Sequence, residues 1–293
     1  MSKKRLLWLG YGDIAARCIP KLLAQRFEVC AVSRSEKPVP EGCDHRIGNL
    51  SNLDFVQSLL NEPVDFIAVT LSPDERNAPA YKKTYLETAK QLVAACELKQ
   101  NRPSQIVFVS STSVYHQQSG EWVNENSSTQ PKRETAQILL QAEHCLLDSG
   151  LPVCCLRFSG IYGDGRKHLI EQVLKGAGGD AQWTNRIHSS DCARVLAFLF
   201  ELARDGRVLP THLLASDLQP IRSSEIRAWM AQTLGLPSGH LHPTGATDTQ
   251  RMNKRCDSAQ LRALGYEFEF PSYREGYLAQ LKAVKQQLIE QDQ

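Results

Sequence analysis

The feature that most constrains this chain is a glycine-rich turn directly after a short apolar run. The run is Leu6–Leu9, and Gly10-Tyr-Gly12-Asp-Ile-Ala15 follows it. Apolar residues then recur at helical spacing, and a second apolar run covers Phe27–Val32. Strand, glycine turn, helix and strand in this order are typical of the βαβ unit that binds a dinucleotide. The sequence therefore predicts such a unit at the start of the chain.

Each small residue of the turn has a separate role in such a unit. Gly10 permits the tight turn, Gly12 lets the backbone approach a pyrophosphate, and Ala15 still allows close packing of helix on strand. The N–H groups at the helix N-terminus face the phosphates. We expect Gly10, Gly12, Asp13 and Ile14 to contact the cofactor. The alternative is an ordinary tight βα turn, which the flanking strands disfavour.

The end of the second strand indicates which dinucleotide is bound. An acidic residue there binds the ribose 2′-hydroxyl of NAD, whereas an arginine suits the 2′-phosphate of NADP. The chain has Ser33-Arg34-Ser35-Glu36 at this place. A guanidinium pairs well with phosphate, so the sequence favours NADP, with NAD as the second choice. In the alternative, Arg34 is a solvated loop residue and Glu36 takes the ribose.

Apolar runs and helical patterns continue to alternate along the chain. Strands are predicted at 6–9, 27–32, 44–47, 64–70, 105–110 and 153–158, a helix capped by Ser51 or Asn52, and long helices at 81–98 and 132–148. This alternation predicts an α/β fold with a doubly wound parallel (Rossmann) sheet. The pattern loosens after about residue 165. We therefore expect a dinucleotide-binding domain at 1–165 and a smaller substrate lobe at 166–293, some segments of which return to the first domain.

Composition narrows the class of protein. The chain has 293 residues, of which 42% are hydrophobic and 23% charged, with a net charge of +2. These values predict a soluble protein without a nucleic-acid or membrane partner. Leu6–Leu9 is too short for a signal peptide, and no run approaches the ~18 apolar residues of a spanning helix. The nine cysteines are scattered without a C-x-x-C, which favours reduced thiols in a cytoplasmic protein.

Further segments suggest a family. They are Gly48-Asn49-Leu50, Phe108-Val-Ser-Ser-Thr-Ser-Val-Tyr115, Arg157-Phe-Ser-Gly-Ile-Tyr162-Gly and Arg186-Ile-His188-Ser-Ser-Asp191. With the glycine turn, they make nearly the whole chain resemble the extended short-chain dehydrogenase/reductases, the NAD-dependent epimerase/dehydratase group.

The resemblance implies roles for several residues. It places Asn49 and Leu50 at the adenine and makes Ser111 the equivalent of the family's catalytic serine. Thr70, Leu71 and Ser110 lie where predicted strands end, the edge at which open parallel sheets bind ligands, and we expect them at the cofactor.

The family's acid–base pair is missing from this chain. The family uses Tyr-x-x-x-Lys on the helix after the serine, because this spacing puts the ammonium beside the phenol. Counting back from Glu143, which resembles the family's carboxylate on that helix, gives Thr135 and Leu139 at the two positions. None of the eight tyrosines is followed by lysine four residues later. The chain therefore resembles an atypical member.

Three residues remain as catalytic candidates, each with a structural alternative. Ser111 could bind a substrate carbonyl or hydroxyl, or its hydroxyl could satisfy backbone groups at a strand end. Tyr115 could replace the missing phenol, although no lysine nearby in sequence would lower its pKa. His188 could act with Asp191 as an acid–base pair. Alternatively, a serine beside His188 caps the next helix and Asp191 complements its dipole.

Other polar residues give weaker signals. Arg157 and Arg166 could hold an anionic substrate or form structural ion pairs. His240-x-His242 could bind a metal, but a solvated loop is favoured, and we expect no metal site. No G-x-S-x-G supports hydrolase chemistry.

Two functions remain open. The first is an NADP(H)-dependent oxidoreductase or epimerase acting on a small polar or sugar-like molecule through Ser111 and either Tyr115 or His188. The second is a non-catalytic NADP(H)-binding sensor or scaffold. The family resemblance also implies a homodimer through the two long helices.

Overall fold

The computed structural model describes residues 3–243 and 252–291, which form two units. Unit 1 comprises Met1–Val114, Thr129–Phe158 and Cys192–Leu213, and unit 2 comprises Tyr115–Ser128, Ser159–Asp191 and Leu214–Gln293. The two units are described separately below.

Unit 1 is built on a seven-stranded sheet with the order β11-β7-β5-β4-β1-β2-β3. The strands are β1 (Lys4–Leu9), β2 (Phe27–Ser33), β3 (Cys43–Ile47), β4 (Phe66–Val69), β5 (Gln105–Ser111), β7 (Val153–Phe158) and β11 (His212–Ala215). All pairs from β3 to β7 are parallel, which confirms the predicted doubly wound sheet. The edge strand β11, beside β7, was not predicted.

The central strand β1 explains why the strands read as unbroken apolar runs. Leu7 lies opposite Cys30 of β2 and Ile67 of β4. Leu6, Trp8 and Leu9 have no exposed surface. A strand with neighbours on both sides and helices on both faces has no polar side, so its sequence does not alternate.

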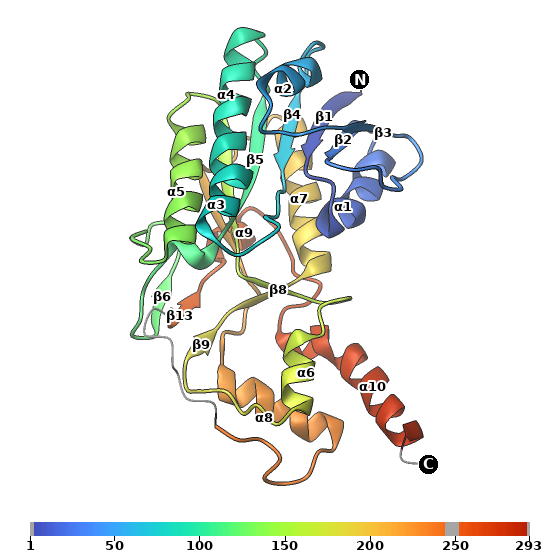
Figure 1. Cartoon of the computed structure of the whole chain (residues 1–293), viewed down its shortest axis with the longest axis vertical. Coiled ribbons are helices and arrows are strands. Elements are labelled where there is room, and N and C mark those ends of the chain that lie inside the picture. The colour runs from blue at the N-terminus through green and yellow to red at the C-terminus, as the bar shows by residue number, and fades with distance from the viewer. Residues whose placement is uncertain (1–2, 244–251, 292–293) are drawn as a thin grey trace. The chain divides into compact units, whose positions relative to one another are not determined.

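Helices cover both faces of this sheet (Figure 1). Helices α1 (Asp13–Ala24) and α7 (Ser189–Arg204) lie on one face, and α2 (Leu53–Leu59), α4 (Thr88–Leu98) and α5 (Glu134–Leu147) on the other. Asn52 caps α2, as predicted, by accepting the Phe55 N–H at 3.0 Å. The predicted helix 81–98 is less regular than expected, because α3 (Ala78–Tyr81) and a π-helical turn, η1 (Lys82–Glu87), precede α4.

The described residues of unit 2 form three two-stranded sheets and four helices. The sheets pair β6 (Glu121–Val123) with β13 (Lys254–Cys256), β8 (Gly160–Tyr162) with β10 (Arg186–His188), and β9 (Trp183–Thr184) with β12 (Ile221–Arg222). The helices are α6 (His168–Leu174), α8 (Ser223–Leu234), α9 (Ala259–Ala263) and α10 (Tyr273–Gln291). An apolar cluster that includes Val173, Met230, Tyr273 and Leu281 forms a core.

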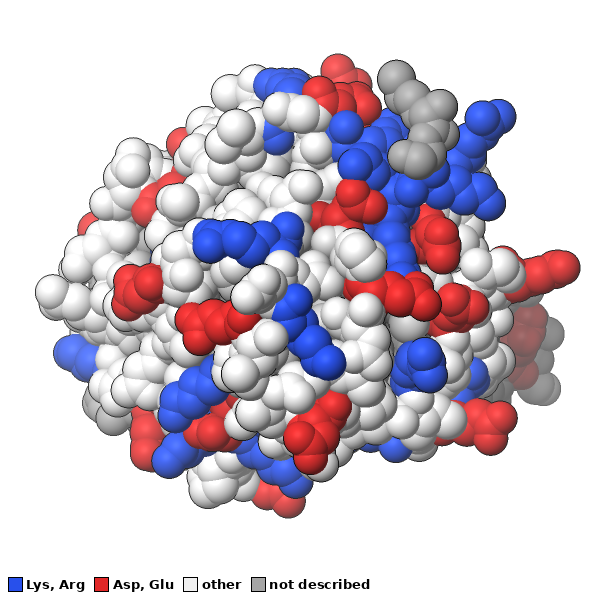
Figure 2. Space-filling view, turned by 90° about the horizontal axis from the view of Figure 1, so that it is seen from above, with Lys and Arg blue, Asp and Glu red and all other residues white. Residues whose placement is uncertain are grey.

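Charges of both signs are interspersed over most of the face seen in Figure 2, and basic side chains gather at one side of this face. Among the described helices, none combines the length and the apolar character needed to cross a membrane. All nine cysteines are free thiols. Six of the nine are buried: Cys18, Cys96, Cys154, Cys155, Cys192 and Cys256.

Candidate functional site

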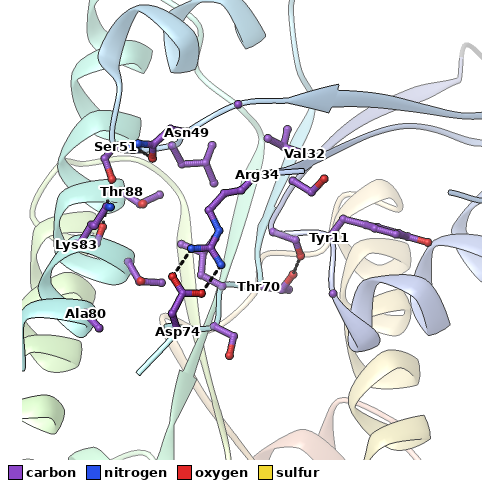
Figure 3. A pocket seen from close by; sticks show the side chains of 18 of the residues that line it. Tyr11, Val32, Arg34, Asn49, Ser51, Thr70, Asp74, Ala80, Lys83 and Thr88 are labelled. Atoms are coloured by element: carbon purple, nitrogen blue, oxygen red, sulfur yellow. Dashed lines mark hydrogen bonds and ion pairs between the residues drawn. The ribbon is translucent and has the colours of Figure 1, made fainter. Parts of the chain in front are cut away.

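Unit 1 contains a cavity of about 470 Å³ where β1, β2 and β4 end. Eight of the residues predicted to bind the cofactor line it: Gly10, Gly12, Ser33, Arg34, Asn49, Leu50, Thr70 and Leu71. Figure 3 shows this cavity with side chains from the glycine turn, from the end of β2 and from the helical segment before α4. The structure therefore brings together predicted residues that lie as far apart in the sequence as Gly10 and Leu71.

The glycine turn is fixed in place by the end of β4. Gly10 has a φ of +100°, and a Cβ atom there would lie 2.6 Å from the carbonyl oxygen of Thr70. The Thr70 hydroxyl donates to the carbonyl of Gly10 at 2.9 Å and accepts the indole N–H of Trp8 at 2.6 Å. Gly12 differs, because a Cβ atom there would meet nothing within 4 Å. The turn thus needs Gly10 for its conformation and leaves open space at Gly12.

Helix α1 starts directly after the turn. Gly12 occupies its N-cap position, and among the described residues no side chain caps the first N–H groups. Such a helix start offers N–H donors and a partial positive charge to an anion. Asp13 and Ile14 lie in this first turn but are not among the residues that line the cavity, and Asp13 forms an ion pair with Arg17 at 2.9 Å.

The segment after β2 folds back over the cavity. The ammonium of Lys37 donates to the carbonyl of Tyr11 in the glycine turn at 3.0 Å. The Ser33 hydroxyl donates to the carbonyl of Ser35 at 2.5 Å and lies 2.7 Å from Nε2 of His45. Ser35 and Glu36 are not among the lining residues, whereas Arg34 is.

The guanidinium of Arg34 binds the carboxylate of Asp74, which follows β4. Its two terminal nitrogens donate to the two carboxylate oxygens, each at 2.5 Å. This pairing raises the pKa of Arg34 and lowers the pKa of Asp74. Asp74 also lines the cavity, so the pair lies within the site.

The opposite wall contains the Gly48-Asn49-Leu50 segment. A Cβ atom at Gly48 would lie 2.4 Å from the ring of Phe55, so the close approach of α2 requires glycine here. The amide oxygen of Asn49 accepts the N–H of Ser51 at 3.0 Å. Since that oxygen is already engaged, the amide NH₂ is the group suited to donate to a ring nitrogen of a base.

The other described lining residues were not predicted from the sequence. They are Tyr11, Val32, Lys37, Gly48, Ser51, Ser72, Asp74, Glu75, Asn77, Pro79, Ala80, Lys83, Thr84 and Thr88. Lys83 and Thr84 lie in the π-helical turn η1, a type of irregularity that is frequent at functional sites. The rule that ligands bind where parallel strands end points to 72–75, but it does not identify a partner for Arg34.

A buried ion pair holds α5 to the strands beneath it. The carboxylate of Glu143 accepts from Nε of Arg157 at 3.0 Å, from another guanidinium nitrogen at 2.5 Å and from the Ser110 hydroxyl at 2.5 Å. Glu143 and Arg157 are almost entirely buried. Arg157 therefore forms the structural ion pair that was its alternative role, and Ser110 binds Glu143.

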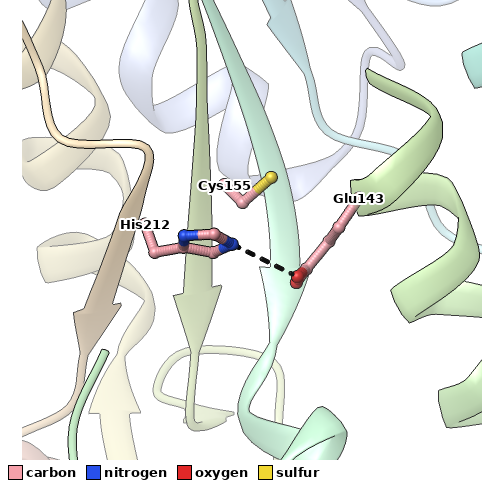
Figure 4. Close-up of side chains that lie close together, drawn as sticks. All are labelled: Glu143, Cys155 and His212. Atoms are coloured by element: carbon pink, nitrogen blue, oxygen red, sulfur yellow. Dashed lines mark ion pairs between the residues drawn. The ribbon is translucent and has the colours of Figure 1, made fainter. Parts of the chain in front are cut away.

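Cys155 and His212 lie beside this carboxylate (Figure 4), and one potential ligand atom of each residue lies within 4.8 Å of the others. The geometry does not suit a metal ion, because Arg157 already binds both oxygens of Glu143. Burial, and next the charge of Arg157, lower the pKa of His212. Nε2 of His212 lies 3.9 Å from the Glu143 carboxylate.

The residues at the positions of the family's acid–base pair lie on α5. Leu139 is buried and Thr135 is half-buried. The hydroxyl of Ser111 accepts the N–H of Ser113 at 3.1 Å. This contact is the backbone-satisfying role considered for Ser111 from the sequence.

The other two catalytic candidates belong to unit 2. Tyr115 has no exposed surface, and the Lys254 ammonium donates to its carbonyl oxygen at 3.1 Å. Burial lowers the pKa of Lys254 to about 8. His188 is buried, its Nδ1 accepts the N–H of Ser190 at 3.2 Å, and its ring centroid lies 3.8 Å from that of Phe270.

Asp191 binds groups near the C-terminus of the chain. Its carboxylate accepts the Tyr266 hydroxyl at 2.7 Å and the N–H groups of Glu269 and Phe270, each at 2.9 Å. These contacts anchor the 266–270 segment within unit 2. His240 lies 2.9 Å from the carbonyl of Val173 through Nε2, while residues 244–249 of its loop are outside the described residues.

Comparisons with known proteins place the chain in a family. The model of the NAD-dependent epimerase/dehydratase family matches residues 10–209, which include the glycine turn and the cavity. The chain belongs to this family. A comparison with the curated proteins found no match.

Solved structures of similar proteins have the same fold. A protein from Methylobacillus flagellatus, assigned as an NAD-dependent epimerase/dehydratase, is 31% identical with a TM-score of 0.80, and the match covers 97% of this chain and 100% of that one. MoeE5, described with UDP-glucuronic acid and NAD, is 23% identical with a TM-score of 0.77 over 97% and 99% of the chains. A UDP-glucuronic acid 4-epimerase from Bacillus cereus, described with its substrate and NAD, is 18% identical with a TM-score of 0.80 over 96% and 99%.

Proposed function

We propose that this family member binds a nicotinamide dinucleotide in the cavity of unit 1. The observation that carries the proposal is the cavity itself, which combines the glycine turn, the start of α1 and the ends of β2 and β4. The residues present fit the group: Gly12 leaves room for a pyrophosphate, and the amide NH₂ of Asn49 suits an adenine ring nitrogen.

We propose NADP(H) as the preferred dinucleotide. Arg34 lines the cavity at the end of β2, whereas Glu36, the residue that would favour NAD, is not among the lining residues that the structure describes. A planar guanidinium pairs with a phosphate through two parallel hydrogen bonds. NAD is the second candidate, because MoeE5 and the Bacillus cereus epimerase are both described with NAD.

We further propose an oxidoreductase or epimerase acting on a small polar or sugar-like molecule. A nicotinamide in the site supplies hydride exchange. Ser111 would hold a carbonyl or hydroxyl of the substrate, and Tyr115 or His188 would carry the proton in place of the missing Tyr-x-x-x-Lys pair. The substrate class is supported by MoeE5 and the Bacillus cereus epimerase, which are both described with UDP-glucuronic acid.

The second candidate function is a non-catalytic NADP(H)-binding sensor or scaffold. Leu139 is buried where the family has its lysine, and Tyr115 has no exposed surface. The hydroxyl of Ser111 already accepts a backbone N–H. These three observations favour binding without chemistry.

Oxidation of bound NADPH separates the two functions. The protein loaded with NADPH is mixed with a panel of carbonyl compounds, the protein loaded with NADP is mixed with UDP-sugars, and the absorbance of the reduced nicotinamide is followed. The enzyme proposal expects the absorbance to fall with at least one carbonyl compound or to rise with at least one UDP-sugar, at a slower rate in Ser111→Ala. Tight cofactor binding without an absorbance change with any compound would favour the sensor.

We also propose a homodimer through the long helices that include α4 and α5, on the basis of the family alone. Light scattering after size-exclusion chromatography measures the molar mass of the protein directly. The mass of a monomer at all protein concentrations would refute the homodimer.

A further inference from the structure

We propose that Asp74 determines cofactor specificity by competing with a 2′-phosphate for Arg34. The inference rests on the proposed function, namely that the cavity of unit 1 takes a dinucleotide. Asp74 would then hold Arg34 while NAD is bound and release it when NADP enters.

The ion pair crosses the site. Arg34 follows β2 and Asp74 follows β4, and these strands lie on opposite sides of β1 in the sheet. Since neighbouring strands are about 4.8 Å apart, the pair spans about 10 Å across the end of β1, where the glycine turn begins. Figure 3 shows the two side chains pointing toward each other across the cavity.

The pair is accessible to solvent and to ligand. The side chains of Arg34 and Asp74 are 63% and 67% exposed. An ion pair with this exposure contributes little to folding, because water screens it and both side chains lose rotational freedom. Arg34 can therefore exchange one partner for another without disturbing the sheet.

A carboxylate and a phosphate present similar oxygen pairs to a guanidinium. The two terminal guanidinium nitrogens donate to Asp74, each at 2.5 Å. A 2′-phosphate that takes the same end-on pair of donors must displace Asp74, and it then meets the negative charge of that carboxylate nearby. A 2′-hydroxyl carries no charge and leaves the pair closed. Asp74 thus opposes NADP more than NAD.

Asp74→Asn removes the charge and keeps the shape of the side chain. At a separation of about 5 Å in water, one carboxylate opposing a phosphate dianion changes an equilibrium constant by about tenfold. The Kd for NADP is expected to fall about tenfold in Asp74→Asn, and the Kd for NAD to change by less than about twofold. Titration calorimetry with NADP and with NAD measures both, and Asp74→Ser provides a second variant of this exposed residue.

Glu75→Gln is the matched comparison. Glu75 also lines the cavity, but its carboxylate binds the amide of Asn77 and not Arg34. If Asp74 acts by holding Arg34, Glu75→Gln changes the NADP affinity by only about twofold, and Asp74→Asn has a smaller effect in an Arg34→Gln background.

The outcomes are distinct. If the ratio of NADP to NAD affinity in both Asp74 variants stays within twofold of the wild-type ratio, the inference is overturned, while the proposal of dinucleotide binding is unaffected. An equal gain in Glu75→Gln would overturn it as well, because the effect would then be one of overall charge. If the wild-type protein binds neither dinucleotide, the proposed function itself fails.

Discussion

Substituting the two glycines of the turn separates their roles. Gly10→Ala places a methyl group 2.6 Å from the carbonyl oxygen of Thr70 and forces alanine to a φ of +100°. Gly12→Ala adds the same methyl group where no atom lies within 4 Å, at an extended φ of −130°. Both variants add a single methyl group, at positions two residues apart.

The two variants are expected to change the free energy of unfolding by different amounts. A left-handed conformation costs alanine about 1–2 kcal/mol, and the contact with Thr70 adds to this cost. Thr70 cannot move freely, because its hydroxyl binds Trp8 and Gly10. We expect Gly10→Ala to lower the free energy of unfolding by about 2–4 kcal/mol. Gly12→Ala should change it by less than about 0.5 kcal/mol.

Gly12→Ala should impair dinucleotide binding although it hardly changes stability. The added methyl group occupies space that a pyrophosphate needs, so we expect the Kd for NADP to rise at least tenfold although the protein stays folded. Urea denaturation followed by circular dichroism measures stability, and calorimetry measures binding. Equal stability of both variants would refute the account of Gly10, and unchanged binding in Gly12→Ala would refute the account of Gly12.

Two further predictions concern buried charges. Burial raises the pKa of Asp217 to about 8, above its unfolded value, so the folded state retains a proton that the unfolded state releases. Stability should therefore fall by about 1.4 kcal/mol per pH unit between about pH 4 and 8, and Asp217→Asn should abolish this slope in urea titrations; an unchanged slope would contradict the assignment. Glu143→Gln leaves the Arg157 guanidinium buried without a carboxylate and should cost about 3–5 kcal/mol. If the double variant Glu143→Gln/Arg157→Met is no more stable than Glu143→Gln, the cost does not come from the unpaired guanidinium.

The part of the site that lies close in sequence could be predicted. The glycine turn and the segment around Arg34 belong to one βαβ unit, whose strand order and spacing constrain one another. Thr70 could also be placed, because strand ends meet at one edge of a parallel sheet. Asn49 was placed by the family resemblance. The doubly wound parallel sheet followed from the alternation of apolar runs with helical patterns, and the short strand predicted at 44–47 is β3 (Cys43–Ile47).

The contacts of exposed side chains could not be predicted. Asp74 lies in a segment without periodicity, and only the folded chain brings it to Arg34, forty residues away. Lys83 reaches the cavity from a π-helical turn that helical spacing does not reveal. The edge strand β11 is four residues long and is separated from its neighbour β7 by a long segment of chain.

The polar residues in the segments that resemble the family could be recognised from the sequence, but their hydrogen-bond partners could not. Asp191 reads as a helix-dipole or catalytic residue from its neighbours in sequence, yet its carboxylate binds groups about 75 residues later. For Ser111, two uses of one hydroxyl were open, and sequence alone does not choose between a strand-end contact and a substrate contact.

Titration calorimetry of the wild-type protein with NADP and with NAD, repeated with Arg34→Ala, tests most directly whether the cavity binds NADP through Arg34. We expect one site per chain, tighter binding of NADP than of NAD, and a loss of affinity in Arg34→Ala that is much larger for NADP. Equal losses for both dinucleotides would contradict the role of Arg34. No binding of either dinucleotide would contradict the assignment of the cavity.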